Sequence, residues 1–233
     1  MVSASFLLMD LPLGWINIVL LLAPRFWFPW PIMRIIGGTA GGLHLKAPKG
    51  FEVRPTPDLV RQAVFNSLGG RVMGARVLEL FGGTGAFSLE CLSRGAASAV
   101  CVERSRKHAR FIEENLTAAR LPPERFHVRV QDVFTALPQL AQAGARFDLV
   151  LADPPYGKKN IGRRSDSLAQ RLLDDPVLPG LLAAGGLFVL GHARRDTLAV
   201  PAVWQERKLM KHGDSMMRFL EVRARPPGAA VSD

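Results

Sequence analysis

Short apolar runs alternate with helix-length segments along most of this chain, and the alternation strongly restricts its fold. Five runs are expected to be strands: 76–81, 99–103, 126–130, 147–152 and 186–191. The segments between them are expected to hold helices at 86–94, 105–120, 133–142 and within 167–184. Strands separated by helices imply βαβ units and a parallel sheet. Two more strands, 204–211 and 215–222, flank His212-Gly213-Asp214 and are expected to form an antiparallel hairpin.

The sequence therefore predicts an α/β, Rossmann-like domain over 57–222, with a mostly parallel seven-stranded sheet and a C-terminal antiparallel hairpin. A length of 233 residues suits one such domain with an appendage. The net charge of +10 favours an anionic partner, nucleic acid first and an acidic membrane surface second. Cys91 and Cys101 have neither metal-site nor redox spacing, which indicates buried thiols in a reducing compartment, the cytoplasm.

Both ends differ from this domain. Residues 1–32 are apolar, with one acid (Asp10) and one base (Arg25), and lack the features of a secretory signal. The apolar run is shorter than a membrane span and is interrupted by Pro12, Gly14 and Asn17, so no stable membrane association is expected. Three interpretations remain: a translated upstream segment with Met33 as the native start, which we favour, a membrane-surface anchor, or a poorly ordered extension. Residues 223–233 are expected to be a disordered tail.

Residues 33–56 are rich in glycine and basic side chains, and they are expected to form a hairpin-like arm. The arm begins with Arg34-Ile-Ile-Gly-Gly38. A helix is expected to follow, with Thr56 as its N-cap and Pro57 in its first position. Apolar residues then recur every four positions from Val60, and Gly69-Gly70 is expected to end the helix.

A glycine-rich turn joins the first predicted strand to the next helix. Phe81 is followed by Gly82, Gly83 and Gly85, which allow a tight turn and close approach to a ligand. Such turns occur in binders of dinucleotides and of S-adenosylmethionine. Glu79, just before the turn, can hold a cationic amino group and would repel a pyrophosphate, so it favours the methyl donor.

Two more acids follow the next two strands. Glu103 ends the second strand, where a carboxylate can accept both ribose hydroxyls. Asp132, followed by Val133, comes after the third strand, where it can bond an adenine amino group. Because ligands of parallel sheets lie at the carboxyl ends of strands, these positions predict an S-adenosylmethionine site without a metal.

Asp153-Pro154-Pro155-Tyr156 follows the fourth apolar run and is typical of a site that methylates an exocyclic amine of a nucleobase. The two prolines fix the backbone and remove two N–H donors. The Asp153 carboxylate and the Pro154 carbonyl can then accept the two amino hydrogens, while Tyr156 can stack on the base. The alternative is that these four residues form a turn without function. The position of the segment directly after a buried strand argues against that alternative.

The chain from Arg34 to about Val222 resembles the bacterial 16S rRNA guanine-N2 methyltransferases. The matching segments include Arg34-Ile-Ile-Gly-Gly38, Arg54-Pro-Thr-Pro-Asp58 and Asp153-Pro-Pro-Tyr156. The resemblance implies a class I methyltransferase that acts, as a cytoplasmic monomer, on guanine N2 within the assembled or assembling 30S subunit. The basic residues expected to contact RNA are Arg34, Lys46, Lys49, Arg54, Arg61, Lys158 and Lys159.

Two other functions stay open at this point. A DNA adenine-N6 methyltransferase uses the same four-residue chemistry, although it normally adds a domain that reads bases. A non-catalytic RNA chaperone that binds the cofactor is the other alternative, and the intact Asp153 and Tyr156 argue against it.

Overall fold

The computed structural model describes residues 33–47, 56–156, 160 and 163–224, all within the compact unit Met33–Asp233. The predictions for residues 1–32, and for Lys49, Arg54, Lys158 and Lys159, lie outside the described residues. Of the predicted tail, Arg223 is described, and its backbone N–H donates to the Val203 carbonyl at 2.8 Å. Among the described helices, none is long and apolar enough to cross a membrane.

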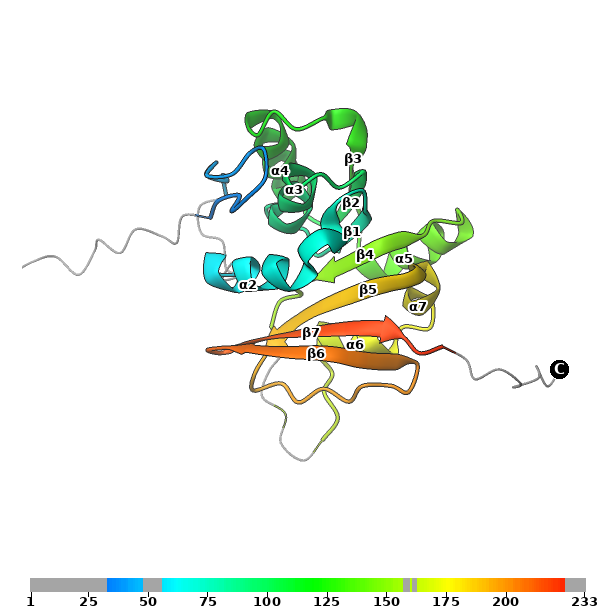
Figure 1. The fold of residues 1–233 in the computed structure, drawn as a ribbon. Coiled ribbons are helices and arrows are strands. Elements are labelled where there is room, and N and C mark those ends of the chain that lie inside the picture. Colours follow the sequence, from blue (N-terminus) through cyan, green and yellow to red (C-terminus); the bar gives the residue numbers. More distant parts are fainter. Residues whose placement is uncertain (1–32, 48–55, 157–159, 161–162, 225–233) are drawn as a thin grey trace, which may run out of the picture. The chain divides into compact units, whose positions relative to one another are not determined.

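Seven strands form one mixed sheet in the order β3-β2-β1-β4-β5-β7-β6, as Figure 1 shows. The first five strands pair in parallel, and β7 pairs antiparallel with both β5 and β6. This order confirms the predicted parallel sheet and its terminal hairpin. The strands are β1 (Arg76–Leu80), β2 (Ser98–Glu103), β3 (Phe126–Val130), β4 (Phe147–Ala152), β5 (Leu182–Ala193), β6 (Trp204–His212) and β7 (Ser215–Val222).

Helices cover both faces of the sheet, as the predicted alternation requires. The main helices are α2 (Asp58–Leu68), α3 (Ala86–Ser93), α4 (Arg106–Ala118), α5 (Val133–Gln142), α6 (Leu168–Asp174) and α7 (Leu178–Leu181). Short 3₁₀ turns lie at Gly69–Val72 and Pro123–Arg125. The helical region predicted within 167–184 is thus two short helices, and β5 begins earlier than predicted.

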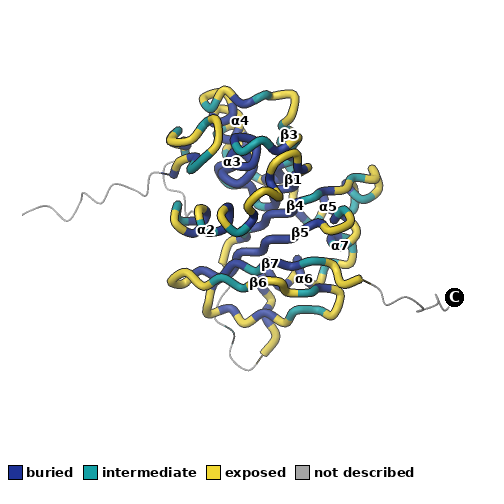
Figure 2. Tube along the Cα trace, viewed as in Figure 1, coloured by how far each residue is buried: buried dark blue, intermediate teal, exposed yellow. Residues whose placement is uncertain are grey.

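The core has two layers because side chains alternate along each strand. In β1, Val77 packs with α2, α3 and α4, whereas Leu78 and Leu80 pack with α5, α6 and α7. Figure 2 shows the central strands almost wholly buried between these layers. A strand buried on both faces can place polar groups only at its end, so function concentrates at the carboxyl edge of the sheet.

Residues 33–47 form a hairpin-like segment, as predicted for the arm. Arg34 and His44 make an isolated antiparallel bridge, and the Ile35 N–H donates to the Leu43 carbonyl at 2.9 Å. The segment is bound to α3 through Glu90, which is fully buried and accepts the Ile36 and Gly37 N–H groups at 2.5 and 2.9 Å.

Close contact with α3 also explains a glycine in the arm. Gly38 has φ +78°, and a Cβ on it would lie 1.9 Å from the Ser93 carbonyl oxygen. The Ser93 hydroxyl donates to the Gly37 carbonyl at 2.6 Å. The Ile-Ile-Gly-Gly sequence is therefore fitted to the surface of α3.

The predicted start of α2, with Thr56 as the N-cap and Pro57 in the first position, is wrong. The helix begins at Asp58, with Pro57 in the N-cap position and no side-chain capping bond. The Thr56 hydroxyl instead donates to a carboxylate oxygen of Asp153, which is distant in sequence. Thr56 therefore does not cap the helix. Gly69, at φ 53°, ends the helix as predicted.

Candidate active site

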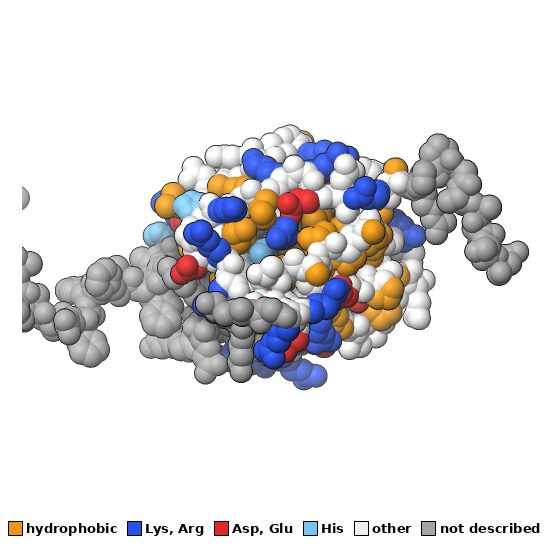
Figure 3. Space-filling view, turned by 90° about the horizontal axis from the view of Figure 1, so that it is seen from below, with side chains coloured by type: hydrophobic (Ala, Val, Ile, Leu, Met, Phe, Trp, Pro, Cys, Tyr) orange, Lys and Arg blue, Asp and Glu red, His pale blue; other side chains and the backbone are white. Residues whose placement is uncertain are grey.

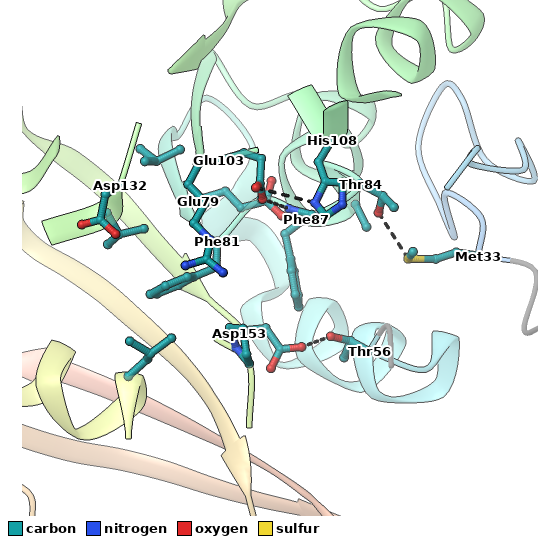
Figure 4. Close-up of a pocket in the computed structure, with 18 of the residues that line it drawn as sticks. Met33, Thr56, Glu79, Phe81, Thr84, Phe87, Glu103, His108, Asp132 and Asp153 are labelled. Carbon is teal, nitrogen blue, oxygen red and sulfur yellow. Dashed lines mark hydrogen bonds and ion pairs between the residues drawn. The ribbon is translucent and has the colours of Figure 1, made fainter. Parts of the chain in front are cut away.

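A cavity of about 250 Å³ lies where the turns after β1, β2, β3 and β4 meet. It collects most of the residues predicted for the donor site and the reacting centre. Those that line it are Glu79, Phe81, Gly82, Gly83, Glu103, Asp132, Val133 and Asp153. Gly85, Pro154 and Tyr156 are not among the lining residues, although Pro155 is. Figure 4 shows side chains from these separate turns around one space.

The glycine turn is held by packing as well as by its backbone angles. A Cβ at Gly82 would lie 2.3 Å from the Cys101 sulfur, and a Cβ at Gly85 would lie 2.9 Å from Ile112. Gly85 also has φ +75°, a region that favours glycine. The turn therefore packs closely against β2 and α4, and its other side faces the cavity.

Glu79 connects the turn to the start of α3. Its carboxylate accepts the Phe87 N–H at 3.2 Å and the Ser88 N–H at 2.9 Å, two donors in the first turn of that helix. Burial raises the pKa of Glu79, while these bonds lower it. Oε2 also accepts the Cys101 thiol at 3.5 Å, whereas Oε1 accepts only the Phe87 N–H among the described residues and retains acceptor capacity, since a carboxylate oxygen offers about two lone-pair directions.

Glu103 and Asp132 occupy the strand ends as predicted. The Glu103 carboxylate accepts the Gly83 N–H and the Ser105 N–H, each at 2.8 Å, and these bonds fix it beside the glycine turn. Asp132 caps α5 by accepting the Phe134 N–H at 2.9 Å. The two carboxylates are therefore both held by backbone donors at the edge of the same cavity.

Asp153 directly follows β4 and is the reacting group predicted from the sequence. Its Oδ2 accepts the Thr56 hydroxyl, and its buried Oδ1 has no hydrogen-bond partner among the described residues. Burial raises the pKa of Asp153 to about 6, and the Thr56 bond opposes that rise. The carboxylate is thus held through one oxygen and left with the other as a free acceptor.

Gly191 in β5 provides space for that free oxygen. A Cβ at this position would lie 2.3 Å from Asp153 Oδ1. Neither Thr56 nor Gly191 was predicted as part of the site. Thr56 belongs to the Arg54-Pro-Thr segment quoted in the family resemblance, which is a signal that could have identified it, whereas a strand glycine carries no such signal.

Tyr156 lies outside the cavity lining, with 37% of its surface exposed. Its hydroxyl donates to the Ser215 hydroxyl at 2.7 Å, which ties the end of the Asp-Pro-Pro-Tyr segment to the start of β7. The ring is therefore positioned by its far end, and its predicted stacking on a base stays a prediction.

The predicted RNA contacts that the structure describes have different environments. Arg34 and Lys46 are exposed, and they make surface ion pairs with Asp58 and Glu114, each at 3.1 Å. Arg61 is wholly buried and lines the cavity instead. Arg61 therefore differs from the exposed basic residues, and its predicted contact with RNA stays a prediction.

Comparisons with known proteins agree with this fold. Residues 33–221 match the family model described as Conserved hypothetical protein 95. Ribosomal RNA small subunit methyltransferase D of Escherichia coli (strain K12) is 32% identical over 193 residues, which cover 82% of this chain and 91% of that protein. The protein of the same name from Haemophilus influenzae is 32% identical over 124 residues, 53% of this chain and 64% of that one.

A solved structure of a hypothetical protein from Thermus thermophilus is 30% identical, with a TM-score of 0.67, and covers 82% of this chain and 100% of its own. The structure of the Escherichia coli protein yhhF gives 30% identity and a TM-score of 0.66, over 83% of this chain and 99% of its own. These likenesses confirm the Rossmann-like fold of class I methyltransferases. The chain therefore belongs to the family described as Conserved hypothetical protein 95.

Proposed function

We propose that this protein transfers a methyl group from S-adenosylmethionine to the exocyclic N2 of a guanine in 16S rRNA of the small ribosomal subunit. The observation that carries the proposal is the Asp153 carboxylate at the wall of the cavity, with one oxygen bonded to Thr56 and the other without a partner among the described residues. The Escherichia coli relative, named as a small-subunit rRNA methyltransferase, supports the rRNA substrate.

The charges that line the cavity support the donor. Four acids line the cavity, Glu79, Glu103, Asp132 and Asp153, together with Arg61, Arg104 and Arg171. Acids at the ends of the strands suit a ligand that carries a sulfonium and an ammonium group. Glu103 would accept the ribose hydroxyls, Asp132 the adenine amino group, and Glu79 the ammonium group. A structure complexed with SAH shares the fold at 17% identity, with a TM-score of 0.55, and at that identity it bears on the fold alone.

The donor supplies an electrophilic methyl group, so the protein has to make the amine a nucleophile. The lone pair of an exocyclic amine is delocalised into the ring. Asp153 Oδ1 and the Pro154 carbonyl would accept the two amino hydrogens and direct the lone pair away from the ring plane. The carboxylate would also stabilise the positive charge that develops on nitrogen. The product cation is acidic enough to lose its proton, so no strong general base is needed.

Basic side chains near this edge of the sheet support an RNA substrate. Arg163 and Arg164 follow β4, and Arg194 and Arg195 follow β5, all of them exposed. Figure 3 shows Lys and Arg side chains spread over one face of the molecule, around an apolar area. Positive charge flanking a base-modifying site favours contact with phosphates. We place the enzyme in the cytoplasm, as a monomer that acts on assembled or assembling 30S subunits.

Methyl transfer from labelled donor to small-subunit particles, naked 16S rRNA and DNA tests the proposal. We expect label in the particle or its rRNA and none in DNA. Label in DNA adenine would favour the alternative, a DNA adenine-N6 methyltransferase, and no label in any substrate would contradict the enzyme assignment.

The Asp153→Ala variant provides the matched control for that assay. It should lose turnover while its affinity for the donor, measured by calorimetry, survives. Loss of donor binding in this variant would mean that Asp153 holds the donor rather than the amine.

A further inference from the structure

Arg61 is a buried cation whose charge is only partly compensated. Its Nη2 donates to the Arg34 carbonyl at 2.5 Å and to the Asp58 carboxylate at 2.6 Å. Its Nε and Nη1 are buried and have no hydrogen-bond partner among the described residues. A guanidinium held out of water with unpaired donors is costly unless a ligand completes its bonding.

Arg61 lies on the face of α2 that packs on the start of α3. Phe65 lies one helical turn further along the same face of α2, and its ring packs on Phe87 with centroids 6.1 Å apart. Phe87 belongs to the first turn of α3, where its N–H donates to Glu79. This face of α2 therefore packs on the region that Glu79 anchors, and Arg61 lines the same cavity.

We propose that Arg61 binds the carboxylate of the amino-acid end of the methyl donor. The inference rests on the proposed function, because it assumes that this donor occupies the cavity. The amino-acid end is a zwitterion, so it needs a cation as well as an anion. Glu79 offers the anion at the glycine turn. Arg61 offers a buried cation whose Nε and Nη1 have no hydrogen-bond partner among the described residues, so it can donate a charge-assisted bond to a carboxylate oxygen.

A phosphate of the target nucleotide has similar chemistry and would be the other anion that Arg61 could hold. Burial favours the donor, because Arg61 has no exposed surface and lies on the helix that packs on the start of α3. Arg163 and Arg194, exposed after β4 and β5, can contact phosphates instead.

The test removes the carboxylate from the ligand and the guanidinium from the protein in turn. Calorimetry would compare S-adenosylhomocysteine with its decarboxylated analogue, S-adenosyl-3-thiopropylamine, which keeps the ammonium group. The wild type should bind the analogue about ten- to hundredfold more weakly, as expected for a charge-assisted bond. Arg61→Met should bind both ligands with similar, weak affinity, and Arg61→Lys should discriminate less than the wild type.

Asp58→Asn is the matched control, since it alters the other partner of Arg61 while keeping the cation, and it should preserve discrimination. Equal affinity of the wild type for the two ligands would overturn the inference, even if Arg61→Met does not fold. Unchanged discrimination in Arg61→Met would also overturn it, and a raised KM for 30S particles in that variant would then assign the phosphate. If the wild type binds neither ligand, the proposed donor itself fails.

Discussion

Replacing Asp153 by Asn should make the protein more stable while it removes activity. The Asp153 carboxyl has its pKa raised from an ordinary 3.8 to about 6, because burial disfavours the charged form. Asn cannot ionise, has nearly the same shape, and keeps an oxygen that can accept the Thr56 hydroxyl. The substitution thus removes a buried charge without creating a cavity.

The expected gain follows from linkage between ionisation and folding. The unfolded chain ionises Asp153 at its ordinary pKa, whereas the folded protein resists ionisation until about pH 6. Stability therefore falls as pH rises between these two values, and the full cost is present above them. A pKa shift of roughly two units corresponds to about 3 kcal/mol. Asp153→Asn should gain up to about 3 kcal/mol at pH 8 and only about 1 kcal/mol at pH 4.5.

Urea unfolding followed by circular dichroism at the two pH values measures this gain. Asp148→Asn is a control of opposite sign, because the Arg76 side chain lowers the pKa of Asp148 and the ionised form stabilises the fold. That stability is present above the ordinary pKa of Asp148, so this variant should lose stability at pH 8. An Asp153→Asn protein no more stable than the wild type at pH 8 would refute the claim that the carboxylate is held in a desolvated site.

Three further predictions concern the same structure. The rate of methyl transfer should fall as pH drops through about 6 and be about tenfold lower at pH 5, because only the ionised Asp153 carboxylate stabilises the positive charge that develops on nitrogen; a flat pH–rate profile would contradict this role. Gly191→Ala should reduce turnover at least about tenfold while donor affinity is kept, since the new methyl would meet Asp153 Oδ1, whereas Gly70→Ala, in open space, should be neutral. Glu90→Ala should lower the free energy of unfolding by about 1–3 kcal/mol, because it leaves the Ile36 and Gly37 N–H groups without an acceptor. If the variant and the wild type were equally stable in urea, the arm would not depend on Glu90.

The sheet and the strand-end acids could be predicted because their signals are local. Apolar runs followed by Glu103, Asp132 or Asp153 identify both a strand and its carboxyl end. The order of strands then brings these acids together without further information. The terminal hairpin was predictable for the same reason, since a turn sequence separates two β-rich runs.

Other parts of the site depend on contacts between distant segments. Thr56 has the local features of a helix cap, yet its hydroxyl bonds Asp153, ninety-seven residues further along the chain. Arg61 is basic, as an RNA contact would be, but the packing of α2 on α3 buries its side chain. Gly191 matters only because the parallel pairing of β4 and β5 places it beside the Asp153 carboxylate. Residue type alone contains none of this information.

The most direct test of the central claim is the identity of the methylated nucleoside. Small-subunit particles that lack the modification would be incubated with donor carrying a deuterated methyl group, digested, and analysed by mass spectrometry. The proposed function predicts deuterium in N2-methylguanosine with the wild type and none with Asp153→Asn. Deuterium in N6-methyladenosine or in a ring-carbon or ribose position, or undiminished labelling by Asp153→Asn, would contradict it.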